Sequence, residues 1–260
     1  MGKRIENNLL HTIVDMQKKE IERLEGEIAK ARHNVYVNTK GDTNWATAPA
    51  ETIKNLLEQH YAGQLNIYDY FGIGDEREVF LSGEINQNIQ LVLTDKEFYE
   101  LTDQPGKCAF TVDQKNLLKD IALPMNKNGS NDGGWQQSDM RGYLNNIYRE
   151  AFPENIKSLF KKFYVEDADT MDYFILRSEM EIFGEHIYSD EDEPGRQIEY
   201  YKIRRNRMKC IGNDFGSAYY WWERSPGYNN SRYFCRVSSS GNANGSGASD
   251  SYLIAPAGCI

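Results

Sequence analysis

The sequence predicts an α+β fold that follows an N-terminal coiled-coil helix. Apolar residues near the N-terminus recur every seven positions, which is the period of a coiled coil. Beyond residue 66, short strand-like runs and amphipathic helices follow one another without the regular β–α–β alternation of a doubly wound sheet. The 260 residues are enough for one large or two small domains with a substantial core.

Residues 1–37 are the predicted oligomerisation helix. The two heptad series are Val14, Ile21, Ile28 and Val35, and Leu10, Gln17, Leu24 and Ala31. This sustained period is longer than a single helix docked on its own globule needs, so we expect a homo-oligomer formed through residues 10–35. β-Branched residues in one series with mostly Leu in the other favour a dimer, whereas Gln17 weakens that preference, so the number of copies stays open.

The rest of the chain divides into a linker with a short helix, residues 38–65, and a ligand-binding domain, residues 66–260. The polar stretch 38–50 is typical of a linker, and a helix is expected at 50–61. Strands are expected at 66–71, 78–82 and 87–93, and helices at 113–122 and 138–152. The second helix has Ser138 as its N-cap and Met140, Leu144, Ile147 and Ala151 on one face. An amphipathic stretch at 156–163, a buried strand at 172–178, a turn at 179–183 and a solvated acidic loop at 189–195 complete the expected elements.

Composition excludes several classes of protein. The formal charge of -9 argues against binding to nucleic acid through bulk charge. No apolar run reaches the roughly 18 residues of a membrane helix, and the N-terminus lacks the apolar core of a signal peptide. We therefore expect no membrane insertion, and a cytoplasmic protein before any assembly. The four cysteines lack the close spacing of a zinc cluster and are expected to be free thiols.

The common motifs of catalysis and metal binding do not appear. Asp190, Asp192 and Gly195 resemble part of a calcium loop, but its twelfth position is Tyr201 instead of glutamate. The four histidines have no ligand spacing, and there is no nucleophile elbow or phosphate loop. The basic run at 202–209 is interpreted as a solvated face. The sequence thus predicts no enzyme, no cofactor and no metal.

The C-terminal tail has a composition of its own. Residues 227–260 contain no Lys, Glu, Gln, Met, Trp, His or Thr, and are rich in Gly, Ser and Asn with interspersed Tyr. Such a bias is typical of a flexible linker. However, Phe234, Val237, Leu253 and Ile254 are spaced like strand residues that face a core. Because Tyr gives contact area at low entropic cost and Ser, Gly and Asn give adaptable hydrogen bonds, we predict that the tail is a folded recognition surface.

Five segments carry a resemblance to a known family. They are GGWQQSDMRGYLN (133–145), DYFILRSEMEIFG (172–184), GRQIEYY (195–201), YWWERSP (220–226) and the ending from Phe234 to Ile260. Over residues 71–260 the chain resembles a phage and gut-bacterial family of unknown function with a C-type-lectin-like, formylglycine-generating-enzyme-like fold. Many members of that family are variable proteins of diversity-generating retroelements, similar to the receptor-binding tips of phage tail fibres. The chain departs from the family at Glu223, where a hydrophobic residue is usual, and in its ending AGC.

The resemblance implies that adenine-directed mutagenesis rewrites a C-terminal segment at about 219–254. The expected variable, outward residues are Tyr228, Asn229, Asn230, Arg232, Tyr233, Arg236, Ser238, Ser240, Asn242, Asn244, Ser246, Ser249, Asp250 and Tyr252. The expected scaffold residues are Trp221, Trp222, Arg224, Phe234, Val237, Ala248 and Pro256. Mutation of the adenines in Asn codons gives Ser, Gly, Asp, Tyr, Ala and Arg but never Lys, Glu, Gln, Met or Trp, which agrees with the composition of the tail.

The resemblance implies a diversified ligand-binding protein of a phage or prophage, located in the virion or in the cytoplasm before assembly. It would be a trimer by analogy with tail-fibre tips, and its partner would be a protein or glycan on a host or target cell. Calcium-dependent sugar binding is not expected, because the nearest strings to the required motifs are QPG (104–106) and EPG (193–195), and WND is missing. Two alternatives remain: an enzyme of the formylglycine-generating type that would use Cys235 and Cys259, and a structural virion protein with a fixed partner.

Overall fold

The computed structural model describes residues 16–17, 20–21, 24, 43–212 and 217–260. Most of the predicted coiled coil at 10–35 therefore lies outside the described residues. The described members of the two heptad series, here called the seam residues, are Gln17, Ile21 and Leu24. They are helical and exposed. Oligomerisation through this segment stays a prediction.

The helices, helical turns and strands are short apart from α2 and β2. In chain order they are α2 (Ala50–Tyr61), η1 (Ile67–Asp69), β1 (Glu76–Leu81), β2 (Gln87–Lys96), β3 (Phe110–Gln114), β4 (Ala122–Leu123), α3 (Asp139–Tyr143), η2 (Leu144–Tyr148), α4 (Glu154–Lys157), β5 (Phe163–Val165), η3 (Glu166–Ala168), β6 (Thr170–Asp172), β7 (Phe174–Ile175), α5 (Glu179–Phe183), η4 (Glu199–Lys202), η5 (Arg204–Arg207), β8 (Lys209–Cys210), β9 (Ala218–Tyr219), β10 (Trp221–Pro226), β11 (Tyr233–Val237), β12 (Ala243–Gly247), β13 (Tyr252–Leu253) and β14 (Ala257–Cys259).

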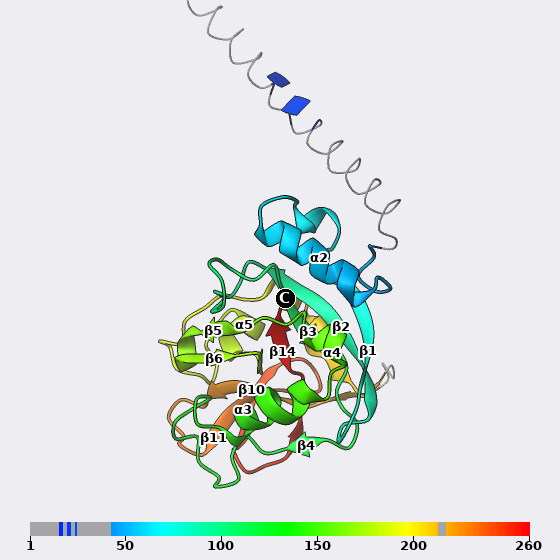
Figure 1. Ribbon diagram of the computed structural model, residues 1–260. Helices are drawn as coiled ribbons and strands as arrows, with labels where there is room; N and C mark the ends of the chain where they lie inside the picture. Colours follow the sequence, from blue (N-terminus) through cyan, green and yellow to red (C-terminus); the bar gives the residue numbers. More distant parts are fainter. Residues whose placement is uncertain (1–15, 18–19, 22–23, 25–42, 213–216) are drawn as a thin grey trace, which may run out of the picture.

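Two five-stranded sheets form the body of the protein. The first has the order β1-β2-β3-β14-β7, so that the C-terminal strand β14 lies inside the sheet, between β3 and β7 (Figure 1). The second has the order β12-β11-β10-β13-β4, with β10 and β13 parallel and the other pairs antiparallel. Residues 254–256 lead directly from β13 in the second sheet to β14 in the first. These sheets and short helices confirm the mixed α+β class.

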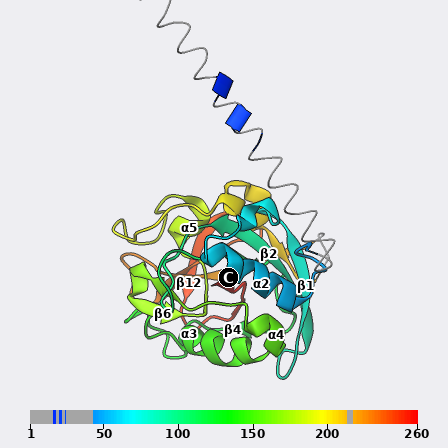
Figure 2. The same ribbon diagram turned by 45° about the horizontal axis from the view of Figure 1, so that its top comes forward.

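Helix α2 lies over the C-terminal end of the chain (Figure 2). The Tyr61 hydroxyl donates a hydrogen bond to the Ile260 carbonyl oxygen at 2.9 Å and accepts one from the Ala109 amide at 2.8 Å. Trp45 is also buried, and its indole packs edge-on against Phe71. Both Trp45 and the apolar face of α2 belong to the main hydrophobic core. The helix predicted at 50–61 is confirmed, and the stretch predicted as a linker is folded against the body from residue 43 onward.

The predicted helix at 138–152 is present, but a π-helical turn interrupts its α-helical spacing. The Ser138 hydroxyl caps α3 by accepting a hydrogen bond from the Arg141 amide, as expected. A π-helical turn, η2, then replaces the regular α-helical spacing. Because a π turn shifts the following side chains around the helix axis, Tyr148 is fully buried whereas Ile147 is 38% exposed. The expectation that Ile147 faces the core was wrong.

The local sequence pattern predicted the wrong secondary structure at two other segments. Residues 66–71 were predicted as a strand but contain the 3₁₀ turn η1, because the Asn66 side chain accepts a hydrogen bond from the Tyr68 amide. Residues 113–122 were predicted as a helix on the spacing of Leu117, Leu118 and Ile121. Their first two residues instead end strand β3, which pairs on both sides with β2 and β14. Tertiary pairing overrides the helical spacing here.

The smaller elements follow the expectations only in part. The amphipathic stretch at 156–163 overlaps the single turn α4, and the predicted strand at 172–178 is divided between β6 and β7. Residues 179–183, predicted as a turn, form helix α5, which Ser178 and Glu181 stabilise with a capping box. Strands at 78–82 and 87–93 correspond to β1 and β2. Within the described part of the chain, no helix combines the length and apolar character needed to cross a membrane.

A buried group of polar and charged side chains connects strand β3 of the first sheet to the segments around residues 177 and 199–209. Asp113 at the end of β3 accepts hydrogen bonds from Arg177 Nε at 3.1 Å, from Arg177 Nη2 at 2.5 Å and from the Tyr201 hydroxyl at 2.6 Å. Burial alone raises the pKa of Asp113, but the charge of Arg177 outweighs it and keeps the pKa below its ordinary value. Lys209, predicted to be solvated, is buried and donates to the Gln114 carbonyl oxygen, and burial lowers its pKa to about 8.

Candidate ligand-binding surface

The residues predicted to vary lie on β11, β12, β13 and the adjoining loops. Nine of them are exposed: Tyr228, Asn229, Asn230, Arg232, Tyr233, Ser240, Asn242, Ser249 and Asp250. Arg236, Asn244 and Tyr252 are half-buried. All seven predicted scaffold residues are buried: Trp221, Trp222, Arg224, Phe234, Val237, Ala248 and Pro256. The alternation of exposed and buried positions therefore separates most of the two predicted sets.

Ser238 and Ser246 do not point outward as expected, since each is only 7% exposed. The Ser238 hydroxyl accepts a hydrogen bond from the Asn242 amide and thereby closes the turn between β11 and β12. The Ser246 hydroxyl donates to the Tyr252 hydroxyl oxygen at 3.2 Å. Both hydroxyls stabilise the surface from within, because a short polar side chain can satisfy local hydrogen bonds without reaching solvent.

Arg236 forms the centre of an aromatic cluster on this sheet. Its guanidinium carbon lies 4.1 Å from the ring centroid of Tyr220 and 4.3 Å from that of Tyr252. Tyr252 in turn packs edge-on against the buried Trp222, with ring centroids 5.0 Å apart. Arg236 Nε and Nη1 have no hydrogen-bond partner among the described residues. Both nitrogens are buried, and cation–π contacts with the two tyrosine rings hold the guanidinium in place.

Tyr219 and Tyr220 are exposed aromatic residues that the predicted set omitted. They are 42% and 38% exposed, and Tyr220 contacts Arg236 directly. The available signal was their position before β10, in which Trp222 belongs to one hydrophobic core and Trp221 to the other.

The loop between β10 and β11 has a fixed backbone with exposed side chains. The side-chain Nδ2 of Asn131 donates hydrogen bonds to the carbonyl oxygens of Asn230 at 2.8 Å and Tyr233 at 2.7 Å. The Tyr228 amide donates to the Tyr188 carbonyl oxygen at 2.7 Å, while its side chain is 56% exposed. Asn229 adopts a left-handed conformation with φ of 59°, which Asn and Gly tolerate better than other residues. The loop thus presents Tyr228 on a rigid support.

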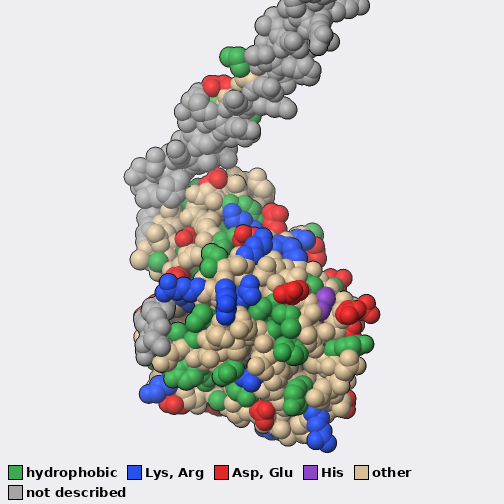
Figure 3. All heavy atoms as spheres, turned by 180° about the vertical axis from the view of Figure 1, so that it is seen from behind, with side chains coloured by type: hydrophobic (Ala, Val, Ile, Leu, Met, Phe, Trp, Pro, Cys, Tyr) green, Lys and Arg blue, Asp and Glu red, His purple; other side chains and the backbone are tan. Residues whose placement is uncertain are grey.

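The face of the molecule that lies behind the view of Figure 1 is mixed in character. Figure 3 shows hydrophobic side chains in separate patches over its middle and lower parts, with backbone and other uncharged side chains between them. Lys and Arg side chains lie mainly around the upper part of the same face.

An acidic hollow of about 510 Å³ opens beside the candidate ligand-binding surface. Its walls carry six carboxyl groups: Glu166, Asp167, Asp169, Asp190, Asp192 and Glu193. Arg224, which also lines the hollow, binds Asp167 and Glu181 at 2.8 Å. Glu193 lies in the loop predicted to be solvated, yet its Oε1 accepts a hydrogen bond from Ser225 at 2.5 Å. Burial raises its pKa to about 7.

A Glu193→Gln variant should remove a pH-dependent loss of stability. The pKa of Glu193 rises from 4.5 to about 7 on folding, so the carboxyl group binds a proton more tightly in the folded protein than in the unfolded chain. The free energy of unfolding therefore falls between about pH 4.5 and pH 7, by on the order of 2 kcal/mol for this partly exposed group. Relative to wild type, the variant should gain this amount between pH 5 and pH 8 in urea unfolding with a chelator. The exposed Glu191→Gln serves as the control, and equal pH profiles for wild type and Glu193→Gln would contradict the prediction.

The sequence over residues 112–260 matches a family whose description is a domain of unknown function, DUF6273. The chain belongs to this family. No curated protein and no solved structure matches the chain. The DUF6273 segment begins within β3 and contains all of the second sheet and strand β14 of the first. It therefore includes every residue of the candidate surface.

The two cysteines of the enzyme alternative belong to different parts of the DUF6273 segment. Cys235 lies in β11, where Glu223 and Glu179 are its charged neighbours. Cys259 lies in β14, and its thiol interacts with that of Cys108. The structure thus associates each cysteine with a different cluster of side chains.

Proposed function

We propose that this protein binds a ligand or receptor through a diversified surface displayed on a C-type-lectin-like scaffold. The contacts would come from the exposed side chains of β11, β12 and the loops, together with Tyr219, Tyr220 and Arg236. The ligand would be a protein or glycan on a host or target cell. In this proposal the chain is a phage or prophage variable protein, and it performs no catalysis.

The observation that carries the proposal is the interleaving of exposed and buried positions. Tyr233 is 43% exposed, whereas the next residue, Phe234, is fully buried in the main core. A substitution at an exposed position leaves the packing of its neighbour intact, because the two side chains point to opposite faces of the strand. Such a surface tolerates changes of sequence while the fold persists, which is the property that diversification requires.

Self-association would strengthen weak binding. The seam residues Ile21 and Leu24 are 54% and 42% exposed, and burial of such residues between helices stabilises a coiled coil. A trimer that displays three copies of the surface would gain avidity without any new contact. Light scattering at micromolar concentration tests self-association. If the protein is a monomer, both the coiled coil at 10–35 and the gain in avidity drop out of the proposal.

The nucleotide sequence of the gene and its surroundings tests diversification directly. We expect AAC or AAT codons at Asn229, Asn242 and Asn244, and a nearby repeat of the 3′ coding region that differs at adenines. A reverse-transcriptase frame should accompany the repeat. If the gene lacks both the repeat and these codons, the surface is not diversified. The alternative of a structural virion protein with a fixed partner would then be favoured.

A further inference from the structure

Glu223 occupies an unusual environment in β10. Its side chain is fully buried, and neither carboxyl oxygen has a hydrogen-bond partner within residues 43–212 and 217–260. Glu223 is also the position at which the chain departs from the hydrophobic residue usual in the family it resembles. A buried carboxyl group without partners costs free energy, so its presence calls for a compensating interaction.

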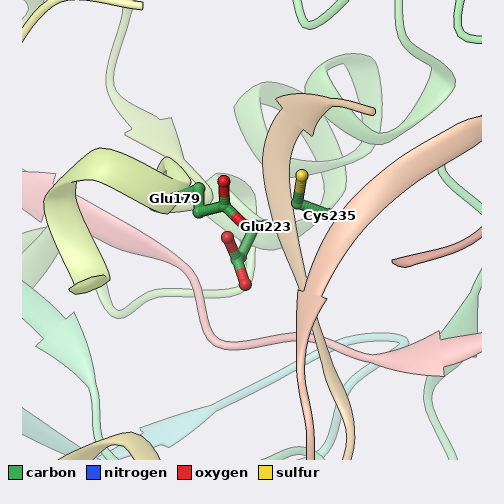
Figure 4. Close-up of side chains that lie close together, drawn as sticks. All are labelled: Glu179, Glu223 and Cys235. Atoms are coloured by element: carbon green, nitrogen blue, oxygen red, sulfur yellow. The ribbon is translucent and has the colours of Figure 1, made fainter. Parts of the chain in front are cut away.

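Two other ligand-type side chains lie against Glu223. Figure 4 shows the carboxyl groups of Glu179 and Glu223 close together, with Cys235 on the neighbouring strand. One oxygen from each carboxyl group and the Cys235 sulfur all lie within 4.8 Å of one another. All three residues are buried. They come from α5, β10 and β11, so the arrangement depends on the packing of the helix against the second sheet.

The backbone fixes Glu179 in the orientation that this cluster needs. Its Oε2 accepts hydrogen bonds from the amides of Ile187 at 2.7 Å, Tyr188 at 2.8 Å and Ser189 at 2.8 Å. Its Oε1 has no partner in the described part of the chain. Three amide donors therefore fix the orientation of the carboxyl group. Glu179 is thus held with one oxygen available.

The charges around the cluster have one sign. Burial raises the pKa of Glu223 and of the Cys235 thiol well above their ordinary values, and the neighbouring carboxyl groups Glu179 and Glu193 add to the effect. Arg224, which follows Glu223 in β10, binds Asp167 and Glu181 instead. A cation at the cluster would reverse these shifts, because a bound divalent ion is the largest charge in its surroundings.

We propose that Glu179, Glu223 and Cys235 bind a divalent cation of the zinc class. Carboxylate and thiolate ligands together suit Zn²⁺, whereas Ca²⁺ and Mg²⁺ require oxygen ligands throughout. With Zn–S bonds of about 2.3 Å and Zn–O bonds of about 2.0–2.2 Å, two ligand atoms of a tetrahedral site lie about 3.5 Å apart. The three ligand atoms of the cluster lie within 4.8 Å of one another, so the side chains would move closer together when the ion binds.

The acidic hollow lies next to the cluster and contains a candidate for the fourth ligand. Ser189 and Glu193 line the hollow, and Ser189 also donates its amide to Glu179. Glu193 Oε2 is buried and has no hydrogen-bond partner among the residues described. The carboxyl groups of the hollow would attract a cation, and either Glu193 or water would complete a tetrahedral site.

Titration of the purified full-length protein, stripped with a chelator, with Zn²⁺ tests the proposal. We expect one Zn²⁺ per chain by calorimetry, and a rise in the unfolding temperature with Zn²⁺ concentration because the ion binds only the folded site. Substitution with Cd²⁺ or Co²⁺ should give a thiolate-to-metal absorption band. Loss of a second-shell partner typically weakens metal binding by about 10–100-fold, so Glu223→Gln, which loses a ligand, should weaken it at least about 100-fold.

Matched variants separate the site from unspecific binding. Cys235→Ser should abolish the absorption band, whereas Cys210→Ala, which changes a cysteine outside the cluster, should retain it. Asp190→Asn on the rim of the hollow should retain one bound ion. Glu223→Leu is a second variant that should fold, since it places a hydrophobic side chain in a buried position, and it should bind no Zn²⁺. The proposal is overturned if wild type binds no stoichiometric Zn²⁺, or if folded Glu223→Gln and Glu223→Leu bind it as wild type does.

Discussion

An Asp113→Ala variant is expected to lose about 3–5 kcal/mol of the free energy of unfolding. The substitution leaves Arg177 buried without its main partner, and it removes the acceptor of the Tyr201 hydroxyl and of the Thr94 hydroxyl at 2.7 Å. An unpaired charge in the interior costs more than the original pair contributed, because the desolvation of Arg177 is no longer compensated. Urea unfolding followed by circular dichroism measures the change.

Two further variants identify the origin of this loss. Lys202→Met removes one partner of an exposed ion pair with Glu199 and should change the free energy of unfolding by less than about 1 kcal/mol. The double variant Asp113→Ala/Arg177→Met should recover part of the loss, since no charge remains unpaired. A loss no larger in Asp113→Ala than in Lys202→Met would show that the buried pair contributes no more to stability than an exposed one.

Tyr233→Ala and Phe234→Ala, adjacent on β11, are expected to have opposite effects. Phe234→Ala should cost about 3–5 kcal/mol of stability, because it opens a cavity in the main core. Tyr233→Ala should change stability by less than about 1 kcal/mol, since its ring is 43% exposed. If Tyr233 is a central contact, its removal should weaken ligand binding by at least about 30-fold, which corresponds to about 2 kcal/mol.

Glycan arrays and a displayed peptide library are the probes for the binding measurement. A ligand found with wild type is compared with Tyr233→Ala, with Tyr228→Ala in the same loop, and with the distant exposed variant Phe80→Ala on β1 as a control. Unchanged affinity in both tyrosine variants would place the binding surface elsewhere. A large loss of stability in Tyr233→Ala would make Tyr233 a core residue.

Several features could be predicted because neighbours in the sequence determine them. The amphipathic period and the proline at its start specify α2, and the hydroxyl of Ser138 specifies the start of α3. Alternation along β11 distinguished the exposed Tyr233 from the buried Phe234 in the same way. Each of these depends on hydrogen bonds or side-chain directions within a few residues.

Contacts between distant segments determined the remainder. Ser238 and Ser246 resemble surface residues by type, but the turn and Tyr252 that bury them are known only after β11, β12 and β13 have paired. Residues 113–122 have helical spacing, yet pairing of β3 with β2 and β14 stabilises the protein more than one isolated helix would. The π turn that buries Tyr148 instead of Ile147 likewise reflects packing against Phe152 and Phe174.

The sequence by itself determined the α+β class, the positions of the longer elements and the alternation of the C-terminal tail, because these depend on local periodicity and composition. Only the tertiary structure placed Arg236 between Tyr220 and Tyr252, and assembled Glu179, Glu223 and Cys235 from three elements. Members of each group are separated along the chain. Their proximity therefore results from the burial of apolar surface between the sheets, which no local pattern specifies.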